Sequence, residues 1–543
     1  MTKKIIFMLL VISAFSRNAF SQDSDAVNSA SRFDYFLPIE RSMFQRYEEK
    51  LSARDILFHT AFRTWRADEV RKVIPFDSLN TLPVKDSKFN RTWLGRKLRK
   101  EHLFTVDKDD FRLAVDPLFD FSVSRETEQK KNLYTNTRGA QILGSIGKQF
   151  TFYTGFYETQ ATFVHYLDST IRFTGVVPGQ GKVKVLKGGG FDYGLAFGGV
   201  SYTPSKYFNV QLANDKNFIG DGYRSLLLSD NAFNYPFLKL TADVWRFKYT
   251  VLYAEFIDLL SPHDPDLGYR KKYGTFHYLD INIGKPLYFG FFEAVIWKTD
   301  LYGARGFELS YLNPVIFLRP VEGSLDSPDN MMLGANVRYK ISDHTAFYGQ
   351  LMLDEFKLDE IKSGKGWWAN KQAFQVGIKS FSVARIKNLN LQTEFNFVRP
   401  YTFQHRSTLQ NYAHYNQALA HPLGANFIET VGLLDYRWKH WYMNAKIISS
   451  IIGKDTAGLN FGSNIFSNYF TYNSPHGNYA LQGLKTNLLY YELKFGYTVN
   501  PLYNFNIELG IAGRDYKNDL SEEKTMLITF GIRTNLTDKY YDF

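Results

Sequence analysis

Cysteine does not occur anywhere in the 543 residues. Its absence excludes disulfides and thiolate chemistry, and it also excludes a lipid anchor on an N-terminal cysteine. After the first residues no run of about 18 consecutive apolar residues is present, so the sequence predicts no helical membrane span. A nucleophile elbow, a phosphate-binding loop, a metal-binding histidine pattern and a nucleic-acid-binding module are lacking too. We therefore expect no enzyme, no cofactor, no metal and no nucleic-acid partner.

Residues 1–21 have the layout of an export signal. Lys3 and Lys4 precede an apolar core at 5–15, and Ala19-Phe20-Ser21 offers the small residues that signal peptidase reads. We expect cleavage after residue 21 and export of the mature chain. A short buried helix is the alternative interpretation of the same residues.

Aromatic residues are abundant although the chain is not apolar on average. They make up 17% of the sequence, with 48 Phe and 36 Tyr, while the mean hydropathy is only −0.29. A transmembrane β-barrel has this composition, because lipid-facing residues alternate with polar lumen residues and aromatic girdles mark both interfaces. The net charge of +11 suits acidic polysaccharide or lipopolysaccharide phosphates, and a merely soluble basic surface explains it equally well.

Apolar and polar residues alternate through residues 106–543, which we expect to form the barrel. Leu391 and Phe395 fall on one face of a strand, whereas Gln392 and Glu394 fall on the other. The clearest alternating windows are 208–212, 388–397, 489–498, 503–512 and 526–536.

A soluble β-sandwich or propeller would alternate as well. The export signal, the aromatic excess, strands of about ten residues and an aromatic chain end favour a membrane barrel. Such a barrel must close, because lipid cannot satisfy an open sheet edge. We expect an all-β fold, a transmembrane antiparallel β-barrel of about 18 strands in the cell outer membrane.

Residues 22–105 precede the alternating region and predict a small periplasmic segment, part helical and part irregular. Ile39, Met43 and Tyr47 recur at helical spacing. We expect one or two amphipathic helices between residues 38 and 66.

The chain ends on Tyr540-Tyr541-Asp542-Phe543 after the last alternating window. We expect the final strand to close on Phe543, and the barrel-assembly machinery to recognise this terminal aromatic. Outer-membrane lipid and lipopolysaccharide are the other expected partners.

Residues 159–187 and 402–426 are the expected outer loops, because outer loops are the longer ones. Three histidines in the second region match no metal-site spacing and predict a solvated loop: His405, His414 and His421.

Trp367-Trp368 is the best candidate for ligand contact, because sugar rings stack on aromatic faces. An interfacial girdle position is the alternative interpretation of this pair. The full set of expected glycan-contacting residues is Trp367, Trp368, Arg224, Tyr412 and Tyr415.

The segment Asn214–Ala232 is polar and glycine-rich, then briefly apolar, then polar again. This order predicts a segment inside the barrel or at its mouth. The expected plug residues are Asn214, Asp215, Phe218, Gly220, Gly222, Arg224, Ser229, Asp230 and Asn231. In one interpretation four charged residues pair with one another across the lumen: Asp215, Lys216, Asp221 and Arg224.

This segment resembles the motif of Wzi-type capsule-assembly outer-membrane proteins, in which an aromatic-glycine turn precedes a leucine-rich piece and a Ser-Asp-Asn-Ala run. Further motifs are similar to the Bacteroidota branch of that family, the RemB-type gliding-motility proteins. They are Arg305-Gly306-Phe307-Glu308, Tyr311-Leu312-Asn313-Pro314, Arg319-Pro320-Val321-Glu322, Ser327-Pro328-Asp329-Asn330 and the stretch from Asn411 to Asn426.

The resemblance implies an 18-stranded barrel with a periplasmic helical part and an interior blocked by side chains. It also implies a surface lectin that holds exported polysaccharide, or a role in gliding with a motility or export complex. Our leading hypothesis is therefore a non-enzymatic barrel that binds, retains or organises surface polysaccharide and supports gliding. The alternative is an outer-membrane diffusion or uptake channel, which the polar lumen face favours.

Overall fold

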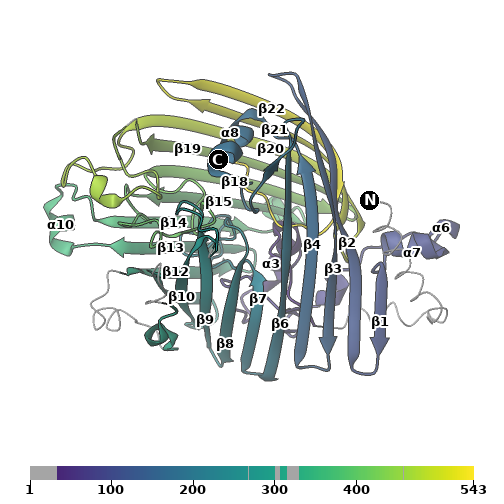
Figure 1. The fold of residues 1–543 in the computed structure, drawn as a ribbon. Coiled ribbons are helices and arrows are strands. Elements are labelled where there is room, and N and C mark those ends of the chain that lie inside the picture. The colour runs from purple at the N-terminus through teal and green to yellow at the C-terminus, as the bar shows by residue number, and fades with distance from the viewer. Residues whose placement is uncertain (1–33, 267, 300–305, 315–328, 457) are drawn as a thin grey trace.

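A closed barrel of 18 antiparallel strands forms the body of the protein, as the prediction required. The structure is a computed structural model that describes residues 34–543 except 267, 300–305, 315–328 and 457. The strands follow one another around the wall in chain order, and the barrel closes where β22 pairs with β2 (Figure 1). The wall strands are β2 (Phe111–Glu126), β3 (Lys131–Ile146), β4 (Phe150–Ala161), β6 (Phe191–Ser205), β7 (Phe208–Asp215), β8 (Tyr235–Val244), β9 (Phe247–Asp258), β10 (Arg270–Asn282), β11 (Leu287–Lys298), β12 (Asn330–Ser342), β13 (Thr345–Glu355), β14 (Lys371–Ser380), β15 (Leu389–Val398), β18 (Phe427–Trp438), β19 (Trp441–Lys454), β20 (Leu484–Asn500), β21 (Phe505–Lys517) and β22 (Glu522–Arg533).

Smaller elements lie at the two ends of the wall. The short strands are β1 (Phe104–Lys108), β5 (Lys184–Val185), β16 (Ala413–His414) and β17 (Gln417–Ala418). The helices are α3 (Arg41–Leu51), α4 (Ala67–Arg71), α5 (Phe76–Leu79), α6 (Lys88–Arg91), α7 (Trp93–Arg99), α8 (His165–Thr174) and α10 (Leu358–Ser363), with single 3-10 turns η3 (Leu309–Leu312), η4 (Val383–Arg385) and η5 (Tyr469–Thr471). No helix in the described part of the chain is long and apolar enough to cross a bilayer.

Alternation along the sequence becomes a two-faced wall. In β15, Leu391 is exposed on the outer face, whereas Gln392 and Glu394 are buried on the inner face. Phe495 and Phe530 are exposed on the outer faces of their strands in the same way. An apolar exterior over a polar lining is the pattern of a barrel whose wall faces lipid.

The two ends of the barrel differ in their connections. Tight turns join β6 to β7, β8 to β9, β12 to β13 and β18 to β19 at one end, which we call the short-turn end. The opposite, long-loop end carries the connections 162–190, 216–234, 259–269, 356–370, 399–426 and 455–483. The two expected outer loops both lie at this long-loop end.

Helix α3 lies in the short-turn end of the barrel. The side chain of Arg41 at its start donates hydrogen bonds to Gln392 and Asp435 of the wall, at 2.8 and 2.7 Å. Met43 and Tyr47 are buried, as their spacing predicted. Helix α3 is the one helix formed between residues 38 and 66, and it ends at Leu51. The residues that follow make individual hydrogen bonds, such as that of Ser52 with Arg338 at 2.7 Å.

The last ten residues do not continue the final strand, so the prediction that it ends at Phe543 is wrong. β22 stops at Arg533, and the chain then turns into the lumen. Tyr540 and Asp542 are buried there, and the C-terminus lies inside the ring of strands near α8 (Figure 1). The expected signal peptide lies outside the described residues, and so do three parts of the motifs named above: residue 305, residues 319–322 and residues 327–328.

Candidate functional site: an occluded lumen beneath an aromatic loop face

Residues 216–234, which connect β7 to β8, fold into the barrel instead of standing above it. We call this segment the plug. All but Phe233 are buried. Gly220 has a φ of +145°, and a Cβ there would lie 2.4 Å from Nε2 of Gln350. At Gly222 a Cβ would lie 2.5 Å from Oε2 of Glu394, so glycine is needed at both positions for the plug to approach the wall.

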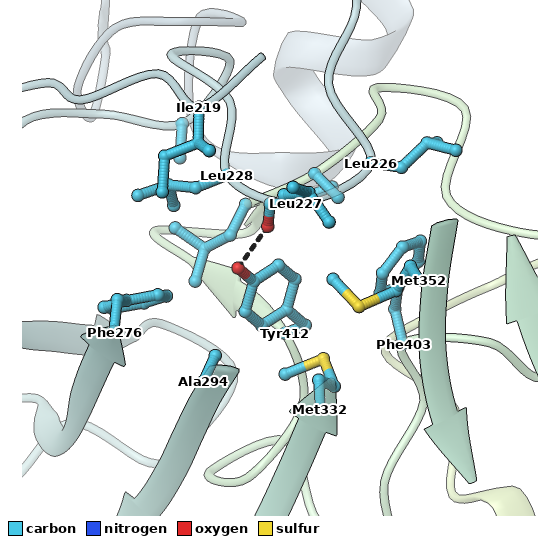
Figure 2. Close-up of a cluster of buried hydrophobic side chains, with 14 of the residues drawn as sticks. Ile219, Leu226, Leu227, Leu228, Phe276, Ala294, Met332, Met352, Phe403 and Tyr412 are labelled. Carbon is cyan, nitrogen blue, oxygen red and sulfur yellow. Dashed lines mark hydrogen bonds between the residues drawn. The ribbon is translucent and has the colours of Figure 1, made fainter. Parts of the chain in front are cut away.

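The apex of the plug is apolar and fills the middle of the lumen. Leu226, Leu227 and Leu228 are fully buried. Figure 2 shows them over inward side chains of β10 to β13 together with Phe403 and Tyr412 of a long loop. The lumen lining is therefore apolar at this level, which differs from the polar lumen that alternation predicted.

Arg224 joins the plug to the wall and to the C-terminal tail. Its Nη2 lies 3.2 Å from Oε1 of Glu429 on β18 and 3.0 Å from Oδ1 of Asp542. All three side chains are nearly inaccessible to solvent. Burial opposes ionisation of Asp542, but Arg224 and Lys446 outweigh it and hold the pKa of this carboxyl well below its usual range.

The side chains of Asp215, Lys216, Asp221 and Arg224 do not pair with one another, which corrects that interpretation. Asp215 accepts a hydrogen bond from Tyr153 at 2.8 Å, and Lys216 donates to the carbonyls of Gly179 and Asp230 at 2.8 and 2.9 Å. Asp221 accepts hydrogen bonds from Thr60 and Asn336. Groups from distant segments therefore satisfy each charge, so the plug is bonded to its surroundings on several sides.

Among the remaining expected plug residues, one lies outside the plug and the others contact neighbouring segments. Asn214 lies on the exposed outer face of β7 and is not part of the plug. The ring of Phe218 stacks under the guanidinium of Arg63 at 4.2 Å. Ser229, Asp230 and Asn231 bond, respectively, to Leu419, Tyr540 and Ala418.

The long loop 399–426 also enters the lumen, so the expectation of a solvated histidine loop is wrong. His405, His414 and His421 are all buried. Ile257 N–H donates to Nδ1 of His414 at 3.0 Å, and Nε2–H of His414 donates to the Asn234 carbonyl at 3.1 Å. Burial lowers the pKa of His414 to about 3, which keeps the ring neutral as this bonding requires.

The C-terminal tail crosses the lumen from the short-turn end to α8. Tyr540 donates to Asp230 of the plug at 2.9 Å, and the Tyr541 carbonyl accepts a hydrogen bond from Tyr166 of α8 at 2.5 Å. The plug, the long loop and the tail thus occlude the lumen together.

A charged cavity of about 340 Å³ lies between the tail and the wall. Its lining reaches from Arg41 and Gln45 of α3 to Tyr166 of α8, and it includes Lys446 and Glu492 of the wall. Among the described residues no group of three or more His, Asp or Glu is arranged to hold a metal ion.

Aromatic residues from two long loops, 356–370 and 455–483, gather on the long-loop face. The Trp368 ring stacks on Tyr472 with centroids 4.7 Å apart and lies 5.1 Å from Tyr469. Trp367, which lies under Nζ of Lys357 at 4.8 Å, is half-buried beside it. We call the solvent-facing part the aromatic patch: Trp367, Phe470, which is 59% exposed, and Tyr479, which is 56% exposed.

The structure separates the expected glycan-contacting residues. Trp367 and Trp368 lie together in or under the aromatic patch. Arg224 and Tyr412 lie in the barrel interior, where Tyr412 donates to the Leu227 carbonyl, so neither side chain reaches a ligand in solvent. Tyr415 is half-buried and packs on Phe233, at a centroid distance of 4.7 Å.

Phe470 and Tyr479 were missed from the sequence. They lie about a hundred residues after the tryptophans, and only the tertiary fold brings the connection 455–483 against 356–370. The local signal was a run of aromatic and small polar residues at 466–479, which is typical of a carbohydrate-contacting loop but is not specific.

No protein-family model and no curated protein matches this sequence. Among solved structures, the chain is similar to Wzi from Escherichia coli, an outer membrane protein involved in group 1 capsule assembly and a carbohydrate-binding β-barrel. The two share 12% identity and a TM-score of 0.54 over 93% of this chain and 100% of Wzi. Pseudomonas aeruginosa OprD matches with 10% identity and a TM-score of 0.42 over 77% of this chain and 94% of OprD. The similarity to Wzi shows a shared barrel fold along nearly the whole chain.

Proposed function

We propose that this protein is a non-enzymatic, occluded outer-membrane barrel that binds and retains surface polysaccharide on its long-loop face. The observation that carries the proposal is the aromatic patch, which stands above a lumen filled by three segments of the chain. Exposed aromatic rings bordered by polar groups are suited to stacking on sugar rings. The carbohydrate binding stated for Wzi, which shares the fold, supports the same conclusion.

The proposed orientation follows from the two ends of the barrel. Short turns face the periplasm in outer-membrane barrels and long connections face the exterior. The aromatic patch is then on the cell surface, and α3 to α7 are on the periplasmic side. Export through the signal at residues 1–21 is part of this proposal.

Hydrogen-bonding groups around the aromatic patch suit a hydroxyl-rich ligand. Lys357 is exposed beside Trp367, and His476 lies 3.3 Å from Glu360 at the rim of the patch. An exposed lysine next to stacking rings favours a polysaccharide that carries carboxylate or phosphate groups. The basic balance of the whole chain agrees with this preference.

Retention of polysaccharide by living cells tests the proposal. A deletion strain is complemented with the wild-type protein, with a Trp367→Ala, Phe470→Ala and Tyr479→Ala triple variant, or with Phe173→Ala. Phe173 is 92% exposed on α8 of the same face but lies outside the aromatic patch, so it is the matched control. We expect the deletion and the triple variant to shed polysaccharide, while the control retains it. Equal retention by the triple variant and the wild type, at equal surface abundance, would overturn the assignment.

The RemB-type resemblance extends the proposal to gliding. Spreading of the same strains on agar tests this extension separately. Normal spreading of the deletion strain would remove gliding from the proposal and leave polysaccharide retention standing.

A channel is the second candidate function, and the charged cavity beside the tail favours it. A passage lined by both lysine and glutamate would admit small polar solutes. Single-protein conductance in planar bilayers separates the two functions. The occluded barrel is expected to stay nearly silent, whereas steady conductance of the wild-type protein would favour the channel.

A further inference from the structure

Residues 85–104, which we call the basic hairpin, include α6 and α7 and form the most cationic stretch at the short-turn end. They contain seven Lys or Arg residues and two acidic residues. Asp86 pairs with Arg91, and Glu101 pairs with Arg96 and Lys97. Four cations form no ion pair with any described residue and are exposed or partly exposed: Lys85, Lys88, Arg99 and Lys100.

The basic hairpin also exposes large apolar side chains. Trp93 is 59% exposed and Leu94 is 51% exposed. Phe89, Leu103 and Phe104 are exposed as well. So many exposed apolar groups within a short segment indicate a surface that something apolar covers.

Its position on the barrel is fixed by hydrogen bonds to the short-turn rim. Asn500 donates to the carbonyls of Lys97 and Glu101 at 3.0 and 2.9 Å. His440, in the turn between β18 and β19, bonds to the Pro83 carbonyl just before the hairpin, at 3.0 Å. In Figure 1, α6 and α7 stand next to β1, beside the end of the barrel wall.

The same rim carries exposed tryptophans that mark the membrane interface. Trp438 and Trp441 flank the turn that holds His440, and both are more than half exposed. Trp245, in the turn between β8 and β9, is 78% exposed. Tryptophan belts lie at the level of the lipid headgroups, so the basic hairpin is attached at that level.

We infer that the basic hairpin binds the anionic phospholipid headgroups of the membrane leaflet at the short-turn end. Apolar residues and unpaired cations on one segment are the two signals of interfacial membrane binding. Trp93 and Leu94 enter the boundary between headgroups and acyl chains, and the four free cations meet lipid phosphates. This inference is independent of the polysaccharide proposal, because it concerns the opposite end of the barrel.

The absence of cysteine allows a direct test on the full-length protein. Leu94→Cys introduces a single thiol for an environment-sensitive dye, and the labelled barrel is placed in nanodiscs of phosphatidylcholine alone or with added phosphatidylglycerol. We expect the dye emission to shift to the blue when phosphatidylglycerol is present. Raising the salt from about 0.1 to about 1 M, which shortens the Debye length from about 10 to about 3 Å, should reverse the shift.

A charge-removal variant and a matched control test whether the emission shift depends on the four free cations. Glutamine replaces the four free cations in the first variant. In the control it replaces four exposed lysines of the long-loop end, Lys130, Lys131, Lys184 and Lys187. The first variant should lose the lipid-dependent shift and the control should keep it. Identical emission in both lipids for the wild type would overturn the inference, and so would a dye already buried in phosphatidylcholine and insensitive to the four cations.

Discussion

Replacing Arg224 with methionine removes a cation that two buried carboxylates share. Glu429 and Asp542 lie 3.2 and 3.0 Å from its Nη2, and the side chains of all three residues are at most 1% exposed. Breaking a buried ion pair by removing one partner costs about 3–5 kcal/mol, because the remaining charge stays buried without compensation. Each carboxylate keeps a second partner, His421 or Lys446, at 2.7 and 2.9 Å. We therefore expect the low end of that range, about 3 kcal/mol.

Hydrogen exchange followed by mass spectrometry measures this loss of local stability directly in the plug. A decrease of about 3 kcal/mol in the free energy of local opening raises amide exchange about a hundredfold. Peptides covering 216–234 should show the increase, while the wall strands β19 to β21 should not. Asp542→Asn in the same background should recover part of the loss, because it removes one of the uncompensated charges.

Arg172→Met is the matched control for this experiment. Arg172 pairs with Asp168 on α8 at 2.7 Å, but its side chain is 47% exposed. Exposed ion pairs contribute about 0–1 kcal/mol, so exchange of the plug should stay within about fivefold of wild type. Unchanged plug exchange in Arg224→Met, or equal changes in the two variants, would show that the buried triad does not hold the plug.

Three further predictions concern the other contacts that close the lumen. Deleting residues 540–543 removes the Tyr540 and Asp542 contacts, so single-protein conductance should rise above that of the wild type; a silent truncated barrel would show that the tail does not block a pathway. His414 has a pKa of about 3 when folded, against 6.5 as the ordinary value, so its contribution to stability is complete above pH 6.5 and is lost as the pH falls toward 3. At pH 5 the loss is about 2 kcal/mol. Protection factors of the amides in 399–426, which correct for the intrinsic pH dependence of exchange, should therefore fall between pH 6.5 and 5 in the wild type but not in His414→Gln, and equal falls would contradict the assignment. Leu227→Ala should lower the free energy of plug opening, measured in urea titrations, by about 2–5 kcal/mol because of the cavity it leaves. Leu212→Ala, on the exposed outer face, should not lower it. Equal effects of the two substitutions would contradict the packing in Figure 2.

Alternation predicted the wall because a strand can place only every second residue on one face. Leu391 and Phe395 face outward while Gln392 and Glu394 face inward, as the sequence required. The change to glycine-rich, then leucine-rich residues at 216–234 similarly identified a segment that is neither strand nor solvated loop. Both signals are local in the chain, so they can be recognised without knowledge of tertiary contacts.

The interior arrangement depends on contacts between distant segments, which local patterns do not encode. Asp542 meets Arg224 across 318 residues, and nothing near either residue specifies that pairing. The tail failed as a strand prediction for the same reason, since Tyr540 and Asp542 suit a strand face as well as a lumen. The histidines of 399–426 were expected in solvent from the polar composition around them, although His414 bonds to the wall and the plug, His421 bonds to Glu429 of the wall, and His405 packs on Tyr469.

The aromatic patch was likewise predicted from the sequence only in part, because the rest of it depends on contacts between distant segments. Trp367 and Trp368 were predicted from the sequence because sugar rings stack on aromatic faces and tryptophans in a loop are suited to such contacts. Their packing with Tyr469 and Tyr472, and the position of Phe470 beside them, depend on two loops that the fold brings together.

Binding of purified polysaccharide to purified protein tests directly whether the aromatic patch holds a surface glycan. The surface polysaccharide of the host strain is titrated against the barrel in nanodiscs by biolayer interferometry, for the wild type, the triple variant of the aromatic patch and Phe173→Ala. We expect saturable binding by the wild type and by Phe173→Ala, and loss of binding in a correctly folded triple variant. Absence of binding by the wild type, or equal binding by all three proteins, would contradict it.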